Sequence, residues 1–314
     1  MYKGLRVCVV VPAYNEERLI ARVIETMPAL VDHIIIIDDH SADETSARAQ
    51  EAADERTEVI RLPENQGVGG AIITGHRRAL DLDADVSVVM AGDAQMDPAY
   101  LPALLDPIAD EGYGFAKANR FFSTKSYEGM PKYRIFGNVV LSFLTKLASG
   151  YWHLFDPQNG YTAVTTDALR RMDLDQIAKR YEFENDFLIN LCIADVPAVD
   201  VPIPAIYAEE VSTIKLRKVI PAISFLLVRG FFRRVMLKYV LRSFSPIALL
   251  LFSGLALLLW SVVFGVWVLY QTIGPPTAST GTVLLCVAPF LVAVQLLLQA
   301  LTLDIQESPD RRRR

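Results

Sequence analysis

The first two thirds of the chain alternates short apolar runs with stretches in which apolar residues recur at helical spacing. The four apolar runs are VCVVVP, HIIII, TEVIRL and DVSVVM, and each is followed by a polar turn and a stretch with helical spacing. Unbroken apolar runs of this length are typical of strands that are buried on both faces of a parallel sheet. Strands that alternate with helices form right-handed βαβ units. The pattern therefore predicts an α/β domain with a mostly parallel sheet over residues 1–214.

The C-terminal third contains two long uncharged runs, from Pro246 to Tyr270 and from Gly281 to Leu303. As a helix, each is long enough to cross the hydrocarbon core of a bilayer, which is roughly 30 Å thick. Because only a short uncharged turn separates them, we predict a hairpin of two transmembrane helices within residues 245–305. The alternative is a helical hairpin buried inside a soluble protein.

Basic residues flank both apolar runs and predict their orientation. Residues 215–244 contain eight lysines and arginines, the tail at 306–314 ends in four arginines, and the intervening turn contains neither residue type. The positive-inside rule then places both termini and the N-terminal domain in the cytoplasm. Residues 215–244 also contain many Leu, Phe, Val and Ile, so we predict basic amphipathic helices at the surface of an anionic membrane. The alternative is a simple positively charged anchor.

Composition narrows the classes of function. The chain has 314 residues and is 52% hydrophobic but still 21% charged, because the apolar residues concentrate in the two predicted spans. A net charge of −5 argues against non-specific nucleic-acid binding, which requires a basic surface. Cys8, Cys192 and Cys286 are scattered in apolar segments, so we expect neither a disulfide framework nor a zinc site. The first apolar run is short and is followed by acidic residues, which predicts a strand rather than a signal peptide.

Polar residues collect where the four predicted strands end, at 14–17, 38–39, 65–70 and 93–97. In parallel α/β sheets, ligands bind outside the carboxyl ends of the strands, so these residues predict one acidic crevice. A phosphate ligand in an acidic crevice requires a divalent cation to offset the charge. The glycine-rich turn NQGVGG would allow a ligand to approach the backbone closely, although an ordinary tight turn explains it equally well.

The segment GDAQMDP offers oxygen ligands of the kind that Mg²⁺ or Mn²⁺ prefers, from Asp93, Gln95 and Asp97. Ala91 stands two residues before Asp93, where a paired-acid site would have its first carboxylate. Mg²⁺ keeps several waters and can bind through one or two protein carboxylates, so the remaining ligands would suffice. Asp97 would assist directly or through water, or it would instead cap the helix that begins at Pro98.

Several segments of the chain resemble the successive motifs of family 2 glycosyltransferases of the GT-A fold, most closely the dolichyl- and polyprenyl-phosphate sugar synthases. These segments are VVVPAYNEE, IIIIDDHSADET, NQGVGGAIITGHRRA, GDAQMDP, KANRF, MPKYRIFGN, DPQNGYTA and FENDFLINL. The resemblance covers nearly all of residues 1–214. It implies a Rossmann-like GT-A catalytic domain there, followed by interfacial helices and two transmembrane helices in the inner (plasma) membrane.

The resemblance implies roles for residues at the donor site. The positions that match the nucleotide-binding motifs are Pro12, Tyr14, Glu16, Ile37, Asp39, Asn65 and Gly67. Ile37 and Asp39 would contact the base, whereas the neighbouring Asp38 has a structural alternative, that of holding the turn. Asp93 matches the second acid of the D-x-D metal motif and Gln95 the glutamine that follows, while the first acid of the motif is absent. Mg²⁺ or Mn²⁺ is therefore the implied cofactor.

Further matching positions concern the acceptor and the sugar. The resemblance implies that Arg120 and Arg134 grip the phosphate of the acceptor, since guanidinium groups suit phosphate oxygens. The alternative is that they are solvated surface arginines. Asn138 occupies a position at which the synthases that this chain resembles commonly have a small hydroxyl residue. Asp156 and Asn159 would contact hydroxyl groups of the donor sugar, or else they only form the turns of DPQNG.

The segment FENDF contributes two acids, Glu184 and Asp186. In glycosyltransferases that attack with a hydroxyl group, an acid near this position is the general base, and Glu184 is also expected near the donor sugar. A lipid phosphate differs from a hydroxyl group because it is already anionic at neutral pH, so its oxygen attacks the anomeric carbon without losing a proton. The acceptor therefore decides whether a base is required.

We expect an inverting, metal-dependent glycosyltransferase that moves a hexose from a UDP- or GDP-linked sugar to polyprenyl phosphate at the cytoplasmic membrane face. One alternative is transfer to a hydroxyl group of a lipid-linked glycan, with Glu184 or Asp186 as the base. An alternative of another class is a catalytically inactive, membrane-tethered binding protein whose metal site decayed at Ala91. Small residues in the spans, Gly254 and Gly265, would also allow packing between subunits of a homo-oligomer.

Overall fold

The computed structural model describes the backbone at residues 1–122, 132–204, 216–273 and 278–310, and the side chains of these residues except 132–135 and 216–220. The chain divides into two compact units. The first comprises Met1–Phe231 together with Pro309–Arg314, and the second comprises Phe232–Ser308. The first unit therefore includes more than half of the segment 215–244 that was predicted to form interfacial helices.

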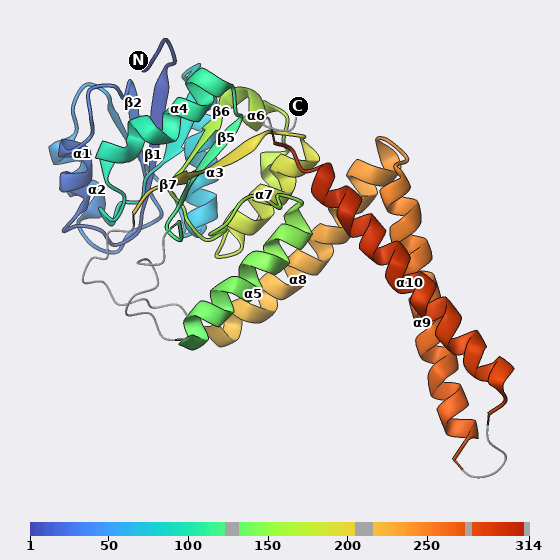
Figure 1. The fold of residues 1–314 in the computed structure, drawn as a ribbon. Coiled ribbons are helices and arrows are strands. Elements are labelled where there is room, and N and C mark those ends of the chain that lie inside the picture. The colour runs from blue at the N-terminus through green and yellow to red at the C-terminus, as the bar shows by residue number, and fades with distance from the viewer. Residues whose placement is uncertain (123–131, 205–215, 274–277, 311–314) are drawn as a thin grey trace. The chain divides into compact units, whose positions relative to one another are not determined.

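A seven-stranded, mostly parallel sheet forms the centre of the first unit (Figure 1), which confirms the predicted fold class. Its strands, in spatial order, are β3 (Thr57–Arg61), β2 (His33–Asp38), β1 (Val7–Ala13), β4 (Val86–Val89), β6 (Thr162–Thr165), β5 (Phe115–Asn119) and β7 (Ala198–Pro202). Strand β6 runs antiparallel to both of its neighbours, and all the other pairs are parallel. The first four strands coincide with the four apolar runs.

Helices cover both faces of the sheet, which explains why its strands are unbroken apolar runs. One face packs against α1 (Ile20–Glu25), α2 (Thr45–Ala52) and α4 (Leu101–Glu111), and the other against α3 (Val68–Asp81), α6 (Thr166–Arg170) and α7 (Phe183–Ile193). In β1, Val9 and Val11 face the first layer, whereas Cys8 and Val10 face the second. Gly75 lets α3 lie close to β1, because a Cβ there would come within 2.1 Å of a Val10 methyl group.

Helix α5 (Lys132–Ser149) and the part of α8 (Leu216–Arg234) that belongs to the first unit extend from the sheet domain and lie side by side (Figure 1). Ala148 of α5, Ile189 of α7 and Leu227 of α8 belong to one buried apolar cluster. Gly230 brings α8 close to α7, since a Cβ at this position would meet the Ile189 side chain at 2.4 Å. This contact anchors the part of α8 that belongs to the first unit.

The second unit contains a π-helical turn, η4 (Val235–Leu241), and two long apolar helices, α9 (Pro246–Gln271) and α10 (Thr280–Gln306). Both long helices have the length and apolar composition of membrane spans. Gly254 and Gly265 of α9 face α10, where a Cβ would lie 2.9 Å from Leu297 and 3.0 Å from Cys286. The structure therefore places these two glycines at the contact between the two helices of one chain.

A buried ion pair joins the two ends of the second unit. The Arg234 guanidinium donates to Asp304 at 2.6 Å, and the Tyr239 hydroxyl donates to the same carboxylate at 2.6 Å. All three side chains are buried. Arg234 is thus different from an exposed basic residue of a headgroup-binding surface, because its charge is matched within the protein.

Candidate active site

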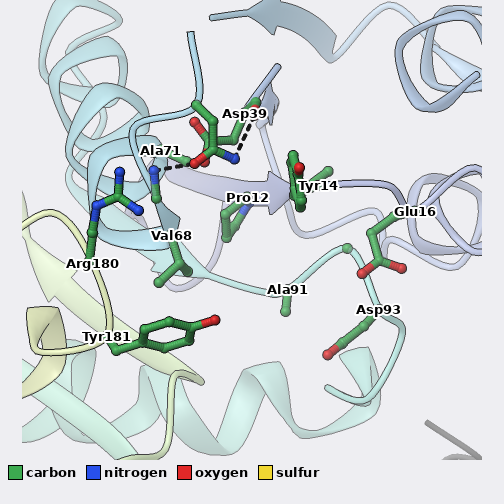
Figure 2. Close-up of a pocket in the computed structure, with 14 residues that line it drawn as sticks. Pro12, Tyr14, Glu16, Asp39, Val68, Ala71, Ala91, Asp93, Arg180 and Tyr181 are labelled. Carbon is green, nitrogen blue, oxygen red and sulfur yellow. Dashed lines mark hydrogen bonds between the residues drawn. The ribbon is translucent and has the colours of Figure 1, made fainter. Parts of the chain in front are cut away.

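A cleft of about 410 Å³ opens beyond the carboxyl ends of β1, β2 and β4 (Figure 2). Seven of the residues predicted to bind the donor or its metal line it: Pro12, Tyr14, Glu16, Asp39, Asn65, Gly67 and Asp93. These residues come from four segments that are far apart in the sequence. The position of the cleft follows from the topology, because parallel strands leave a crevice at this edge of the sheet.

Asp39, the residue after β2, builds one wall of the cleft. Its side chain is 3% exposed, and its two oxygens accept hydrogen bonds from the backbone N–H groups of Gln66 at 2.7 Å and Gly67 at 2.8 Å. Gly67 has a φ of +87°, a conformation that a side chain rarely tolerates. The Asp39 carboxylate therefore fixes the glycine-rich turn in an unusual backbone conformation at the cleft wall.

The two neighbours of Asp39 in β2 lie outside the cleft. Asp38 accepts hydrogen bonds from the backbone N–H of Ser41 at 2.8 Å and from the hydroxyl of Ser46, so it holds the turn, as the structural alternative proposed. The Ile37 side chain is fully buried in the core beneath α3 and is absent from the lining of the cleft. Ile37 therefore faces the core, whereas Asp39, two residues later, lies past the end of the strand and lines the cleft.

The polar turn after β1 is bound to the start of α2. Asn15 has a φ of +58°, its N–H donates to Ser41 Oγ at 2.9 Å, and the N–H of Glu16 donates to Thr45 Oγ1 at 2.8 Å. These contacts hold the turn at the cleft. Figure 2 shows the Glu16 carboxylate at the same end of the cleft as Asp93.

Asp93 is the predicted metal ligand that lines the cleft. Its Oδ1 accepts a hydrogen bond from the backbone N–H of Gln95 at 3.0 Å, and burial raises its pKa. A divalent cation beside this carboxylate would offset the cost of desolvating the charged form. Among the residues that the structure describes, no group of three or more His, Cys, Asp or Glu side chains is arranged to hold a metal. A metal at Asp93 would therefore depend on substrate oxygens and water for most of its coordination.

Asp97 occupies a different position from Asp93. It is absent from the cleft lining, and its Oδ1 accepts a hydrogen bond from the backbone N–H of Ala99 at 2.8 Å. This is N-cap geometry for the short helix η1 (Pro98–Tyr100). The structure therefore shows the capping alternative for Asp97, and of the three predicted metal ligands Asp93 is the one that lines the cleft.

Arg120 and Asp156, which were predicted to bind different groups, bind each other. Arg120 Nε lies 2.7 Å from Asp156 Oδ2, and Nη2 lies 2.8 Å from Oδ1, so the pair is bidentate. Asp156 is 2% exposed, whereas 34% of the Arg120 side chain is exposed. Burial by itself would raise the pKa of Asp156, but the hydrogen bond and charge of Arg120 together lower it. Asn159 lies 3.4 Å from the same carboxylate.

A buried lysine supports this pair; it lies in the segment KANRF but was not among the predicted site residues. Lys117 of β5 is 1% exposed, forms an ion pair with Asp200 of β7 at 3.0 Å, and donates to the carbonyl of Asp156 at 2.9 Å. It also donates to the carbonyl of Phe155 at 2.5 Å. A signal was present in the sequence, because a lysine in the middle of a buried strand requires a partner.

The two acids of α7 have different surroundings. Asp186 is buried and accepts a hydrogen bond from the backbone N–H of Ala178 at 2.9 Å, so it helps to hold the segment before α7. Glu184 lines a second, small cavity together with Lys117 and Asn159, and burial raises its pKa to about 7. Neither acid lines the donor cleft.

The predicted acceptor residues on α5 are described only in part. Arg134 lies in α5, but its side chain is outside the described residues. Asn138, one turn further along the helix, is partly exposed. Both residues therefore lie on one helix, a turn apart.

Comparisons with known proteins agree with the fold. The model of the family "Glycosyl transferase family 2" matches residues 8–175. UDP-N-acetylglucosamine–dolichyl-phosphate N-acetylglucosaminyltransferase of Methanococcus voltae is 33% identical over 215 residues, 64% of this chain and 85% of that protein. Undecaprenyl-phosphate mannosyltransferase of Micrococcus luteus is 31% identical over 214 residues, 65% of this chain and 85% of that protein.

A solved structure shows the same fold. Glucosyl-3-phosphoglycerate synthase of Mycobacterium tuberculosis, crystallised with Mn²⁺ and uridine diphosphate, has a TM-score of 0.54 and 22% identity over 74% of this chain and 80% of that one. At this identity the similarity supports the fold alone. The family model and the two relatives, by contrast, match by sequence over most of the sheet domain. The chain therefore belongs to glycosyl transferase family 2.

Proposed function

We propose that this protein transfers a hexose, with inversion, from a nucleotide-diphosphate sugar to polyprenyl phosphate at the cytoplasmic membrane face. The observation that carries the proposal is the single cleft that gathers Tyr14, Asp39, Gly67 and Asp93 at the carboxyl edge of the sheet. The names of the relatives supply the acceptor class, since both are transferases that act on a polyprenyl-type phosphate.

On the donor side, Asp39 and the glycine-rich turn form the wall against the nucleoside, and Asp93 lies where the diphosphate would bind. Asp93 and Gln95 are the residues that would hold Mg²⁺ or Mn²⁺, and a bound ion would neutralise the diphosphate as it leaves. Glu16 faces the same end of the cleft (Figure 2) and is a second candidate for binding at the diphosphate end. Pro12, Tyr14 and Asn65 complete the proposed nucleotide site.

On the acceptor side, Arg120, Arg134 and Asn138 are the proposed contacts of the lipid phosphate. The carboxylate of Asp156 holds the Arg120 guanidinium in one plane, while about a third of the Arg120 side chain is exposed to a ligand (34%). We therefore propose that Asp156 acts by orienting Arg120, and that Asn159 and Glu184 are the candidates for contacts to sugar hydroxyl groups. A fixed guanidinium suits the oxygens of a phosphate better than a mobile one.

The position of the acids favours phosphate over hydroxyl as the attacking group. A hydroxyl acceptor requires a general base within hydrogen-bonding reach of it, whereas an anionic phosphate does not. Asp186 is buried and bound to the backbone of Ala178, and Glu184 lies outside the donor cleft. The phosphate oxygen attacks the anomeric carbon directly, and a single displacement inverts that centre.

Exposed apolar side chains support attachment to a membrane. Phe136 and Phe143 project from α5, and Phe225 and Val228 project from α8, with exposures between 52% and 71%. The opposite faces of these helices pack against α7. Large apolar side chains that remain exposed along a helix, next to basic residues such as Arg229, suit the interface of an anionic bilayer. The two candidate spans of the second unit are proposed to cross the bilayer, with both termini in the cytoplasm.

One transfer assay tests the proposal. The full chain in membranes is incubated with polyprenyl phosphate and with labelled UDP- and GDP-sugars in turn, with Mg²⁺ or Mn²⁺ and then with EDTA. We expect label in the lipid fraction with one nucleotide class, and its loss when EDTA is present. Absence of lipid-linked label with every donor would contradict the proposal and favour a membrane-tethered binding protein.

A second function is supported by one observation, the pKa of Glu184 near 7, which suits a general base. In that case, the acceptor would be a hydroxyl group of a lipid-linked glycan. Glu184→Gln distinguishes the two functions. Transfer to polyprenyl phosphate would persist in this variant, whereas transfer to a hydroxyl acceptor would be lost.

A further inference from the structure

Two residues outside the predicted nucleotide motifs, Arg180 and Tyr181, line the donor cleft from the segment that precedes α7. Figure 2 shows both residues on the side of the cleft where Val68 lies, across from Glu16 and Asp93. The other charged side chains of the lining are acids. Within the described part of the chain, Arg180 is thus the one cationic residue of the cleft wall.

The segment that carries Arg180 is fixed against the glycine-rich turn. The backbone N–H of Gly70 donates to the carbonyl of Lys179 at 3.0 Å, and the N–H of Ala178 donates to Asp186 at 2.9 Å. A Cβ at Gly67 would lie 2.7 Å from the carbonyl oxygen of Lys179 and 3.0 Å from Cγ of Arg180. The aliphatic stem of Arg180 therefore rests directly on the turn that Asp39 holds in place.

The charged end of Arg180 is exposed, and it forms no hydrogen bond or ion pair with any residue that the structure describes. Two other arginines of the first unit are matched, Arg77 with Asp175 and Arg78 with Glu58. A guanidinium group whose stem is fixed, and whose donors face an acidic cleft, is suited to a ligand that carries acceptor oxygens.

We propose that Arg180 is a specificity-determining contact to the nucleoside end of the donor, with the ring of Tyr181 beside it as a stacking surface. This inference rests on the proposed function. The nucleoside end is favoured over the diphosphate because Arg180 lies across the cleft from Asp93 (Figure 2), the residue proposed to lie at the diphosphate. A guanidinium group donates to the carbonyl oxygens of a base and also stacks on its ring.

Calorimetry of the purified full chain tests the assignment. Wild type is first titrated with UDP and GDP in the presence of Mn²⁺, and then with the monophosphate of the base that binds. We expect Arg180→Ala to weaken both the diphosphate and the monophosphate by about tenfold, which is about 1.4 kcal/mol. Arg180→Lys keeps the charge but not the planar donors, so its affinities should fall between those of Arg180→Ala and wild type.

The matched control is Lys179→Ala, which removes the same charge from the adjacent residue. The Lys179 side chain is exposed, reaches Gln66 at 3.4 Å and is absent from the cleft lining, so nucleotide affinity should not change. Unchanged binding in Arg180→Ala would overturn the inference. A loss confined to the diphosphate would overturn it as well, because it would assign Arg180 to the phosphates. Wild type that binds neither nucleotide would instead refute the proposed function itself.

Discussion

On the donor side of the first unit, carboxylates bind backbone N–H groups, whereas on the acceptor side they bind cationic side chains. Asp39 and Asp93 each accept hydrogen bonds from the loop that they shape. Asp156 instead binds Arg120, and Asp200 binds Lys117. The donor cleft therefore depends on backbone conformation, while the acceptor side depends on a balance of buried charges.

This difference matches the two proposed ligands. A nucleotide sugar is large and is recognised by the shape of its cleft, and its diphosphate charge would be offset by a metal. A lipid phosphate is a small anion, and a cation that is already oriented recognises it. Changes of shape should therefore mainly weaken nucleotide binding, and changes of charge should mainly weaken binding of the acceptor phosphate.

The largest effect is expected from Lys117→Met, which leaves the mostly buried Asp200 carboxylate without its cation. Breaking a buried pair on one side costs about 3–5 kcal/mol, because an unmatched charge stays inside the protein. For a unit of this size, a loss of about 3 kcal/mol lowers the melting temperature by roughly 6–12 °C. Thermal unfolding of the full chain in detergent measures the change.

The control for this experiment removes both charges. Lys117→Met combined with Asp200→Asn leaves no unmatched ion, so its melting temperature should lie well above that of the single variant. A double variant that melts no higher than Lys117→Met would show that the lysine acts through packing rather than charge.

The next effect concerns the shape of the donor cleft. Gly67→Ala places a Cβ 2.7 Å from the carbonyl oxygen of Lys179, at a residue with a φ of +87°. We expect the affinity for the nucleoside diphosphate to fall by about 100-fold, or roughly 3 kcal/mol. Gly4→Ala is the control, since Gly4 has a φ of +88° but open space around it. If both variants bind nucleotide equally well, the cleft does not depend on this close approach.

A smaller effect is expected at the acceptor. Arg120→Lys keeps the positive charge but loses the bidentate geometry with Asp156, so the phosphate would be held less precisely. We expect KM for polyprenyl phosphate to rise about tenfold, or by about 1.4 kcal/mol, with KM for the nucleotide sugar unchanged. Arg78→Lys is a suitable control, because Arg78 also binds a carboxylate through its guanidinium but lies outside the cleft. A rise in both KM values would contradict the separation of the two sides.

The smallest effect is a dependence of stability on pH. Burial raises the pKa of Glu184 from an ordinary value of 4.5 to about 7. Between these values the folded protein holds a proton that the unfolded chain has lost, so stability falls as the pH rises through this window. Glu184→Gln cannot lose a proton, and we expect it to melt above wild type at pH 8 but level with it at pH 4.

Glu182→Gln makes the same chemical change two residues earlier, so it serves as the control. A pH dependence that survives in Glu184→Gln would assign the titration to another group.

Much of the fold and the location of the donor site follow from local sequence patterns. The first four strands and their polar ends could be predicted, because unbroken apolar runs indicate strands that are buried on both faces. Asp38 and Asp39 could be placed at a strand end, but the partners of their side chains could not be predicted, since both bind backbone or hydroxyl groups of residues further along the chain.

The remaining features depend on contacts between distant segments. Arg120 and Asp156 are 36 residues apart, and nothing local indicates that they bind each other. Arg180 enters the cleft only because the segment before α7 packs on the glycine-rich turn.

Strand periodicity could have shown that Ile37 is buried, because it alternates with Ile36 and follows Ile35 on the same face.

The most direct measurement of the central proposal compares Asp93→Ala with Asp97→Ala in the lipid transfer assay, across a titration of Mn²⁺. We predict that Asp93→Ala lowers transfer by about 100-fold or more, as expected when electrostatic support of a leaving group is lost. Asp97→Ala removes only a helix cap and should keep most of the activity. Transfer that is unchanged in Asp93→Ala, or that is indifferent to Mn²⁺ and EDTA in wild type, would contradict the metal-assisted reaction at this cleft.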